Sequence, residues 1–248
     1  MDSKTYKYNT KYIWENLNLI PSDETLQKLF RLHSLLIELN QFQNLTRIIK
    51  NNEYWILHIF DSLWPLKNEI NNSENITKYA DIGSGCGIPG LVIALFMPST
   101  EVFLIDSSKR KTDAIQTIIN KLKLSDRVHI LNERVELTGR RNGFRESFDL
   151  VTARAVASSP VVAEYIIPLL NNSGKGIIYC GQWNDTSTIN LNKTLVHLGG
   201  KISSISNIDL PKQKGIRNVV KIIKDYKCPD NYPRGIGIAN KRPLSLKD

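Results

Sequence analysis

Long apolar runs are absent from the sequence, and cysteine is scarce. No stretch approaches the roughly 20 apolar residues of a membrane-spanning helix, and the N-terminus, MDSKTYKYNTKYIWENLN, has no apolar segment typical of signal peptides. We therefore expect a cytoplasmic protein without a membrane partner. The three cysteines, Cys86, Cys180 and Cys228, form no CxxC pair, and the four histidines lack metal-ligand spacing. Both observations argue against a disulfide framework and against a metal site.

Acidic residues are outnumbered by basic ones. The 248 residues include 33 Lys and Arg against 24 Asp and Glu, which gives a formal net charge of +9. This excess suggests a polyanionic partner, although a coding bias towards Lys, Asn and Ile explains it equally well. The hydrophobic and charged fractions, 41% and 23%, are those of an ordinary globular protein, and the length suits one sizeable core with a small appended unit.

The order of helical and strand patterns predicts two parts. Residues from about 10 to 70 read as helical, with a helix start at Pro21-Ser22 and a second helical stretch over 54–63. After an Asn-rich turn at 71–75, strands alternate with helices. Strands are expected at 79–82, 101–106, 127–132, 148–153, 175–181, 201–208 and 218–223, and helices at 90–96, 107–122, 159–170 and 190–198.

Such alternation predicts an α/β, Rossmann-like sheet of parallel strands with helices on both faces. The last two strands have no helix between them, so we expect them to pair antiparallel at the sheet edge. The predicted organisation is an N-terminal helical extension (1–70), a cofactor-binding domain (71–231) and a basic C-terminal tail (232–248).

The stretch YADIGSGCGIPG, residues 79–90, follows a predicted strand and opens a predicted helix. Glycines there let the backbone approach a nucleotide cofactor. Gly85-x-Gly87-x-x-Gly90 matches the dinucleotide fingerprint, whereas Asp81-x-Gly83-x-Gly85-x-Gly87 matches the loop of S-adenosylmethionine (SAM) methyltransferases. Both cofactors carry an adenosine ribose, whose hydroxyls suit a carboxylate at the end of the next strand, where Asp106 stands.

Asp81 favours SAM over NAD. A carboxylate at this strand end would repel the pyrophosphate of a dinucleotide, but it would attract the ammonium and sulfonium of SAM. An antiparallel final pair of strands is also common in methyltransferase sheets. The sequence therefore argues against an NAD-dependent oxidoreductase.

Eight motifs in order resemble one known family, the bacterial small-subunit (16S) ribosomal RNA guanine-N7 methyltransferases, called RsmG and formerly GidB. The resemblance runs from about residue 36 to 244. The motifs are Asn44-Leu45-Thr46, His58 with Asp61-Ser62-Leu63, DIGSGCGIPG, LIDSSKRK, Arg134-Val135-Glu136, Arg154-Ala155, Gly181-Gln182 and YPRGIGIANKRPL. Many relatives have a basic residue where this sequence has Leu57 and another where it has Cys180.

The resemblance implies a class I SAM-dependent methyltransferase fold and small-subunit rRNA, or an assembly intermediate of that subunit, as partner. It places SAM contacts at positions matching Gly83, Ile88, Val135, Glu136 and Arg154. With the loop argument, the expected cofactor-binding set is Asp81, Gly83, Gly85, Ile88, Asp106, Val135, Glu136 and Arg154. His58 either faces the cofactor or packs in the core.

Arg154 is the catalytic candidate because its strand end faces the transferred methyl group in this fold. The segment TARAVAS lacks the Asn- or Asp-Pro-Pro-aromatic motif of exocyclic-amine methyltransferases, and it has no cysteine nucleophile. Guanine N7 already has a free lone pair, so its methylation needs alignment and no general base. Arg154 could bind the methionine carboxylate or the guanine edge.

The tail is expected to contact RNA through Arg234, Lys241 and Arg242, with Lys247 nearby, and to form no core helix or strand. The alternative is that Tyr232 and Pro233 dock on the domain. Other functions left open are methylation of another RNA or of a small molecule, and a non-catalytic SAM- or RNA-binding module.

Overall fold

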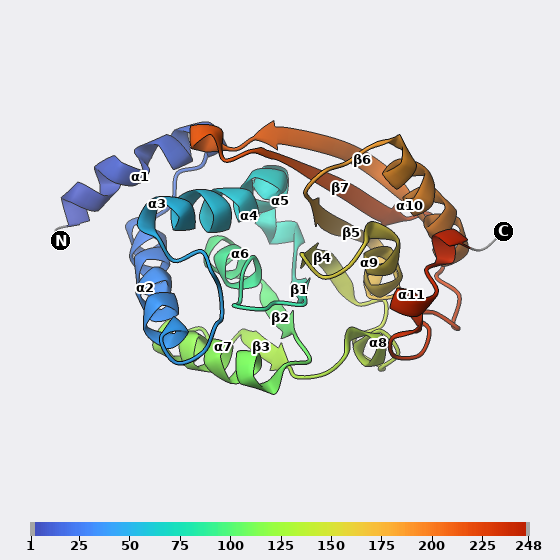
Figure 1. Cartoon of the computed structure of the whole chain (residues 1–248). Coiled ribbons are helices and arrows are strands. Elements are labelled where there is room, and N and C mark those ends of the chain that lie inside the picture. Colours follow the sequence, from blue (N-terminus) through green and yellow to red (C-terminus); the bar gives the residue numbers. More distant parts are fainter. Residues whose placement is uncertain (1–2, 247–248) are drawn as a thin grey trace.

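A seven-stranded sheet forms the centre of the protein, in the order β3-β2-β1-β4-β5-β7-β6 (Figure 1). The computed structural model describes residues 3–246, apart from the side chains of residues 3–9 and 51. The strands are β1 (Lys78–Ile82), β2 (Glu101–Ile105), β3 (Val128–Leu131), β4 (Phe148–Arg154), β5 (Leu170–Cys180), β6 (Gly200–Asp209) and β7 (Ile216–Lys224). Strands β1 to β5 pair in parallel, and β7 pairs antiparallel with both β5 and β6, which confirms the predicted sheet and its final pair.

Alternating side chains of each central strand enter two separate hydrophobic cores. Along β2, Val102 and Leu104 belong to the first core, whereas Phe103 and Ile105 belong to the second. Successive side chains of a strand point to opposite faces, so continuous apolar runs such as EVFLI indicate a sheet buried on both sides. The sheet is therefore the middle of three layers.

Helices cover both faces of the sheet. On the first face lie α1 (Ser3–Leu17), α2 (Asp23–Asn40), α6 (Gly90–Phe96) and α7 (Lys109–Lys121); on the second lie α8 (Val135–Thr138), α9 (Ser159–Ile166), α10 (Asp185–Leu198) and α11 (Ile238–Lys241). No helix within residues 3–246 is long and apolar enough to cross a membrane.

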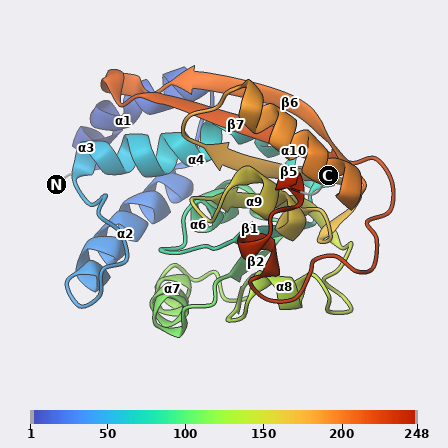
Figure 2. The same cartoon turned by 45° about the vertical axis from the view of Figure 1, so that its right-hand side comes forward.

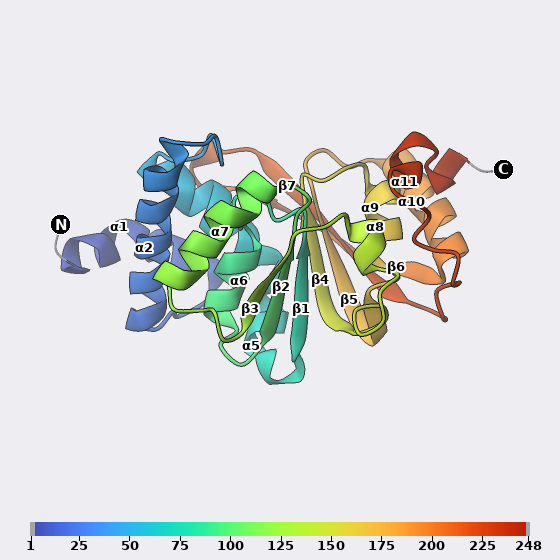
Figure 3. The same cartoon turned by 90° about the horizontal axis from the view of Figure 1, so that it is seen from below.

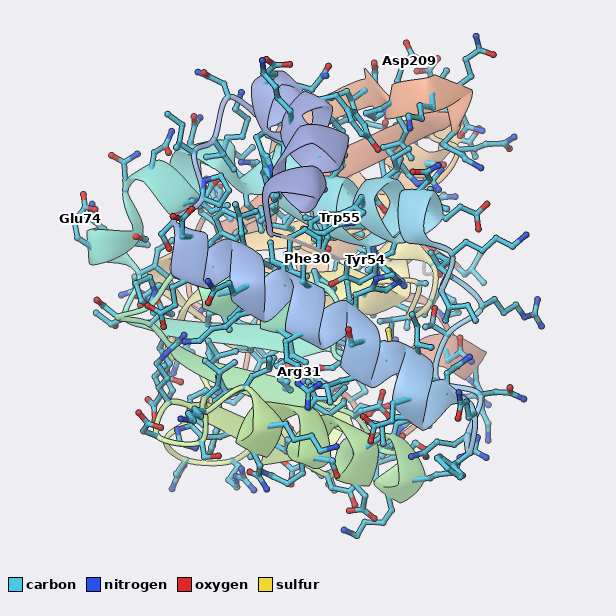
Figure 4. All side chains as sticks on the ribbon, turned by 90° about the vertical axis from the view of Figure 1, so that its left-hand side faces the viewer. Phe30, Arg31, Tyr54, Trp55, Glu74 and Asp209 are labelled. Atoms are coloured by element: carbon cyan, nitrogen blue, oxygen red, sulfur yellow. The ribbon has the colours of Figure 1, made fainter. Side chains whose placement is uncertain are left out.

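α2 packs on α6 and α7, and an aromatic cluster joins the N-terminal helices to one another and to Phe96 of α6. Ser22 caps α2 as expected, since its side chain accepts a hydrogen bond from the Thr25 amide. Figure 4 shows Phe30 of α2 next to Tyr54 and Trp55, and the Phe30 and Trp55 ring centroids lie 4.8 Å apart. The stretch predicted as helical over 54–63 consists of the π-helix η1 (Tyr54–Phe60) and α4 (Asp61–Leu63). Short helical segments flank it: α3 (Asn51–Glu53) before it, and η2 (Trp64–Leu66), α5 (Lys67–Asn71) and η3 (Ser73–Asn75) after it.

The C-terminal segment packs on the domain, so the expectation that it forms no core element is wrong. It contains α11 and a 3₁₀ turn, η5 (Leu244–Leu246), and its Ala239 and Leu244 are 1% exposed within the second core. Tyr232 is also buried, in agreement with the docking alternative. In Figures 1 and 2 this segment runs past α8 and α9. Lys247 lies outside the described residues.

Polar contacts explain why a segment rich in proline and glycine is held in place. The Arg234 side chain donates through Nε and Nη2 to Glu164 of α9, at distances of 2.6 to 3.2 Å. Arg140 Nε donates to the Pro233 carbonyl at 2.8 Å, and Arg145 Nη1 donates to the Tyr232 carbonyl at 2.6 Å. A segment rich in proline and glycine can therefore be buried, provided that its backbone carbonyls find donors.

Candidate functional site

A cavity of about 210 Å³ lies at the carboxyl ends of the parallel strands, among the residues that follow β1 to β4. In Figure 3 the strands stand upright and this edge of the sheet is at the top. Gly83, Asp106 and Val135 line the cavity, together with Val156 and Tyr165. Larger hollows of about 560 and 1050 Å³ border the α1–α2 connection, but they contain none of the predicted site residues. The chemistry therefore points to the smaller cavity, where parallel α/β sheets bind ligands.

The glycine loop brings bare backbone to the cavity wall. Gly83 has φ of +66°, and a Cβ atom at this position would stand 2.7 Å from Val156 Cγ2, so no larger residue fits. The Gly85 amide donates to Asp106 Oδ2 and the Ser108 amide donates to Asp106 Oδ1, both at 2.9 Å. Each carboxylate oxygen has two acceptor sites, so Asp106 can still accept hydrogen bonds from a ligand hydroxyl.

Asp81 lies beneath the loop and is fully buried. Its Oδ2 accepts from the Gly90 amide at 3.0 Å, and its Oδ1 accepts from Thr152 Oγ1 at 2.8 Å. Burial raises the pKa of Asp81 to about 7, although the hydrogen bonds from Thr152 and Gly90 oppose that rise. Asp81 thus ties the glycine loop to β4, and its direct contact with a cofactor ammonium stays a prediction.

Arg154, at the end of β4, joins the glycine loop to the N-terminal helices. Its Nη1 donates to the Leu57 carbonyl at 3.1 Å and to Asp61 Oδ2 at 3.3 Å; its Nη2 donates to the Ile88 carbonyl and to His58 Nδ1, both at 3.3 Å. These four bonds use the four hydrogens of the two Nη atoms. Among the described residues, the Nε–H is the one Arg154 donor without a hydrogen-bond acceptor. A bidentate contact to a ligand would therefore require at least one of the four existing bonds to break.

His58 is a neutral acceptor in this network. It is 2% exposed, and burial, reinforced by the charge of Arg154, lowers the pKa of His58 to about 3. Because arginine only donates, Nδ1 must accept from Arg154, which leaves the proton on Nε2 to donate to Thr46 Oγ1 at 3.2 Å. Of the two predicted roles for His58, packing in the core is therefore the one that agrees with its contacts in this structure.

Asp61 is the second buried group that holds Arg154. It is 5% exposed, and its Oδ2 also lies 3.7 Å from Arg217 Nε. Burial raises the pKa of Asp61, while the two guanidinium groups oppose the rise. Asp61 therefore lies between two guanidinium groups, those of Arg154 and Arg217.

The far wall of the cavity is formed by α8 and is supported by the C-terminal segment. Val135 is 8% exposed and lines the cavity, whereas the adjacent Glu136 is 1% exposed. Glu136 Oε1 accepts from the Gly237 amide at 2.9 Å and from the Tyr165 hydroxyl at 3.4 Å. Burial raises the pKa of Glu136, but the Gly237 amide and Arg134 outweigh it, so the pKa lies below its ordinary value. A direct cofactor contact by the Glu136 side chain stays a prediction.

The structure brings most of the predicted cofactor residues to one edge of the sheet. Gly83, Asp106 and Val135 line the cavity, Gly85 donates to Asp106, and Ile88 is a buried loop residue whose carbonyl accepts from Arg154. The three residues predicted to contact RNA differ in their exposure to solvent. Lys241 and Arg242 are exposed, whereas the Arg234 side chain is 15% exposed and paired with Glu164.

Several supporting residues could not be identified from the sequence. Asp61 belongs to a recognised motif, but nothing local showed that it would meet Arg154. Glu164 lies in an apolar helical stretch, SPVVAEYI, where a single carboxylate signals a buried partner. Its partner, Arg234, is 70 residues away in the chain, so only the fold reveals it.

A family model described as rRNA small subunit methyltransferase G (GidB) matches residues 25–216. The chain belongs to this family. It is 43% identical over 244 residues to the ribosomal RNA small subunit methyltransferase G of Prochlorococcus marinus, a match that covers 98% of this chain and 96% of the relative. The protein of the same name from Synechococcus is 41% identical over 232 residues, with 94% and 91% covered. The matched range includes Gly83, Asp106 and Arg154.

Solved structures agree on the fold. The methyltransferase segment of StiE superposes with a TM-score of 0.51 at 15% identity, covering 67% of this chain and 75% of that chain. The tRNA methyltransferase TrmK of B. subtilis superposes with a TM-score of 0.50 at 11% identity, covering 67% and 66%. At these identities the likeness concerns architecture, which is the class I, Rossmann-like methyltransferase fold.

Metal-ligating side chains do not gather anywhere in the part of the chain that the structure describes. The three cysteines are free thiols, and burial raises the pKa of Cys180 and of Cys228 to about 11.

Proposed function

We propose that the protein transfers a methyl group from SAM to N7 of a guanine in small-subunit ribosomal RNA. The observations that carry the proposal are a backbone-lined cavity, an Asp106 carboxylate on its wall that keeps acceptor sites for a ribose, and a reaction edge at which His58 and Asp61 are both bound to Arg154. Membership of the rRNA small subunit methyltransferase G family supports the RNA substrate.

The residues of the cavity fit SAM. Gly83 exposes bare backbone at the cavity wall, Asp106 retains acceptor sites for the ribose hydroxyls, and Val135 offers an apolar wall for the adenine. The guanidinium groups of Arg154 and Arg217, which lie together at Asp61, suit the methionine carboxylate. When bound, the cofactor would supply an electrophilic methyl group on its sulfonium.

His58 and Asp61, the two titratable side chains bound to Arg154, are not arranged to remove a proton. His58, with its low pKa, keeps Nδ1 occupied by Arg154 and Nε2 occupied by Thr46. Asp61 is buried and shared between two arginines. A guanine N7 needs no deprotonation before it attacks, so alignment by these fixed groups and exclusion of water suffice.

Methylation of an in vitro transcript of small-subunit rRNA, or of assembled subunits lacking the modification, tests this proposal directly. Transfer from labelled SAM should yield 7-methylguanosine by nucleoside mass spectrometry, and a transcript made with 7-deazaguanosine should accept nothing. Transfer to the 7-deaza transcript would show a different acceptor atom. Calorimetry should show binding of SAM and no binding of NAD; the reverse result would refute the proposal.

A further inference from the structure

The loop that joins α2 to α3, residues 41–50, is held in one shape by α2. Asn40 Oδ1, at the end of α2, accepts from the backbone amides of Leu45 at 2.8 Å and Thr46 at 3.0 Å. His33 Nε2, also on α2, lies 2.9 Å from the Ile49 carbonyl. The loop is therefore preorganised.

The same loop lies beside the reaction edge. Thr46 Oγ1 is hydrogen-bonded to His58, and His58 is hydrogen-bonded to Arg154. Two hydrogen bonds thus connect the loop to the strand end where methyl transfer is proposed. Figure 3 places the end of α2 and the loop after it at the same edge of the sheet as the start of α7.

The exposed side chains of this loop combine one aromatic ring with two positive charges. Phe42 is 83% exposed, and Arg47 and Lys50 are exposed as well. The loop sequence, QFQNLTRIIK, contains no acidic residue. Neither cation forms an ion pair within the described part of the chain.

Nearby carboxylates do not neutralise these charges, because each has its own partner. Glu38 accepts from Lys121 at 3.0 Å, and Glu53 accepts from Lys214 at 3.1 Å. Asp61 is shared between two arginines. The loop therefore presents an uncompensated positive surface with a single ring.

We propose that residues 41–50 hold a single-stranded segment of the substrate RNA next to the target guanine, with Phe42 stacked on a base and Arg47 and Lys50 at phosphates. Single-stranded RNA is recognised by aromatic stacking together with basic side chains along the backbone. A docking protein would favour a contiguous apolar patch, whereas Phe42 is flanked by Gln41 and Gln43. The inference rests on the proposed function, since it assigns the RNA path to the same reaction edge.

Binding of a small-subunit rRNA transcript by the full-length protein tests the proposal. Phe42→Ala should weaken the affinity by about 5- to 150-fold, which corresponds to the loss of one base stack, and Phe42→Tyr should retain it. The double variant Arg47→Gln/Lys50→Gln should make the dependence of log affinity on log salt shallower by up to about two units. Ile189→Ala and Lys193→Gln, exposed on α10, are the matched controls and should bind as the unaltered protein does.

Calorimetry with SAM should give the same affinity for every variant, which separates RNA contact from misfolding. Unchanged RNA affinity and salt slope in both loop variants would overturn the proposal. Normal binding of the transcript with lost binding of the assembled subunit would also overturn it, because the loop would then contact ribosomal protein. Absence of methyl transfer by the unaltered protein would refute the proposed function alone, since the loop is judged by RNA binding.

Discussion

Replacing Arg234 with methionine is predicted to destabilise the protein by about 3–5 kcal/mol, the cost of leaving one partner of a buried ion pair alone. The Glu164 side chain is 1% exposed and that of Arg234 is 15% exposed. Methionine has a similar length but removes all three side-chain hydrogen bonds to Glu164, leaving only the bond from the residue 234 amide. A chain of this size should lose about 6–20 °C in melting temperature.

Thermal unfolding of the full-length variant measures this effect. Arg242→Met is the matched control, because Arg242 is an exposed arginine of the same segment and should change stability by no more than about 0.5 kcal/mol. Adding Glu164→Gln to Arg234→Met should recover part of the loss, since it removes the buried charge. A melting temperature for Arg234→Met equal to that of the control would refute the claim that this ion pair holds the C-terminal segment.

Four further outcomes follow from the site. Asp106→Ala should weaken SAM binding by about 1.5–3 kcal/mol through lost charge-assisted hydrogen bonds, and an unchanged dissociation constant would remove Asp106 from the ribose. Arg154→Met should lower turnover and also destabilise the fold by about 2–4 kcal/mol, because four hydrogen bonds disappear; full stability in urea would contradict the network. The pKa of Asp81, raised to about 7, means that the folded state holds this proton more tightly, so its contribution to stability falls as pH rises from about 4 to about 7. Asp81→Asn should flatten the pH dependence of the urea midpoint in that window, and an unaltered profile would count against the assignment. Lys241→Gln with Arg242→Gln should make the salt dependence of RNA binding shallower by up to about two units if both contact phosphates, and no change would exclude these residues from the RNA path.

Local sequence patterns are enough to predict which strands of the sheet are parallel and which are antiparallel. Apolar runs such as YADI and EVFLI, each followed by a turn and a helical stretch, predict parallel strands, and the two closing strands without a helix between them predict the antiparallel pair. The glycine loop could also be predicted from the sequence. Gly83 and Gly85 have positive φ angles, a backbone geometry that only glycine readily adopts. The π-helical form of residues 54–60 could not be predicted from the sequence, since the spacing of its apolar residues resembles that of an α-helix.

Residue types, spacings and the order of elements were determined by the sequence alone, because they depend on interactions between near neighbours in the chain. The partners of charged groups were decided only by the tertiary structure. Arg234 reads as a free cation in a polar tail, yet the fold brings it to Glu164; Arg154 reads as a ligand-binding arginine, yet the fold engages both of its Nη atoms. Whether a charged side chain faces water or a buried counter-charge depends on which distant segments of the chain meet. The residues next to it in the sequence do not determine this.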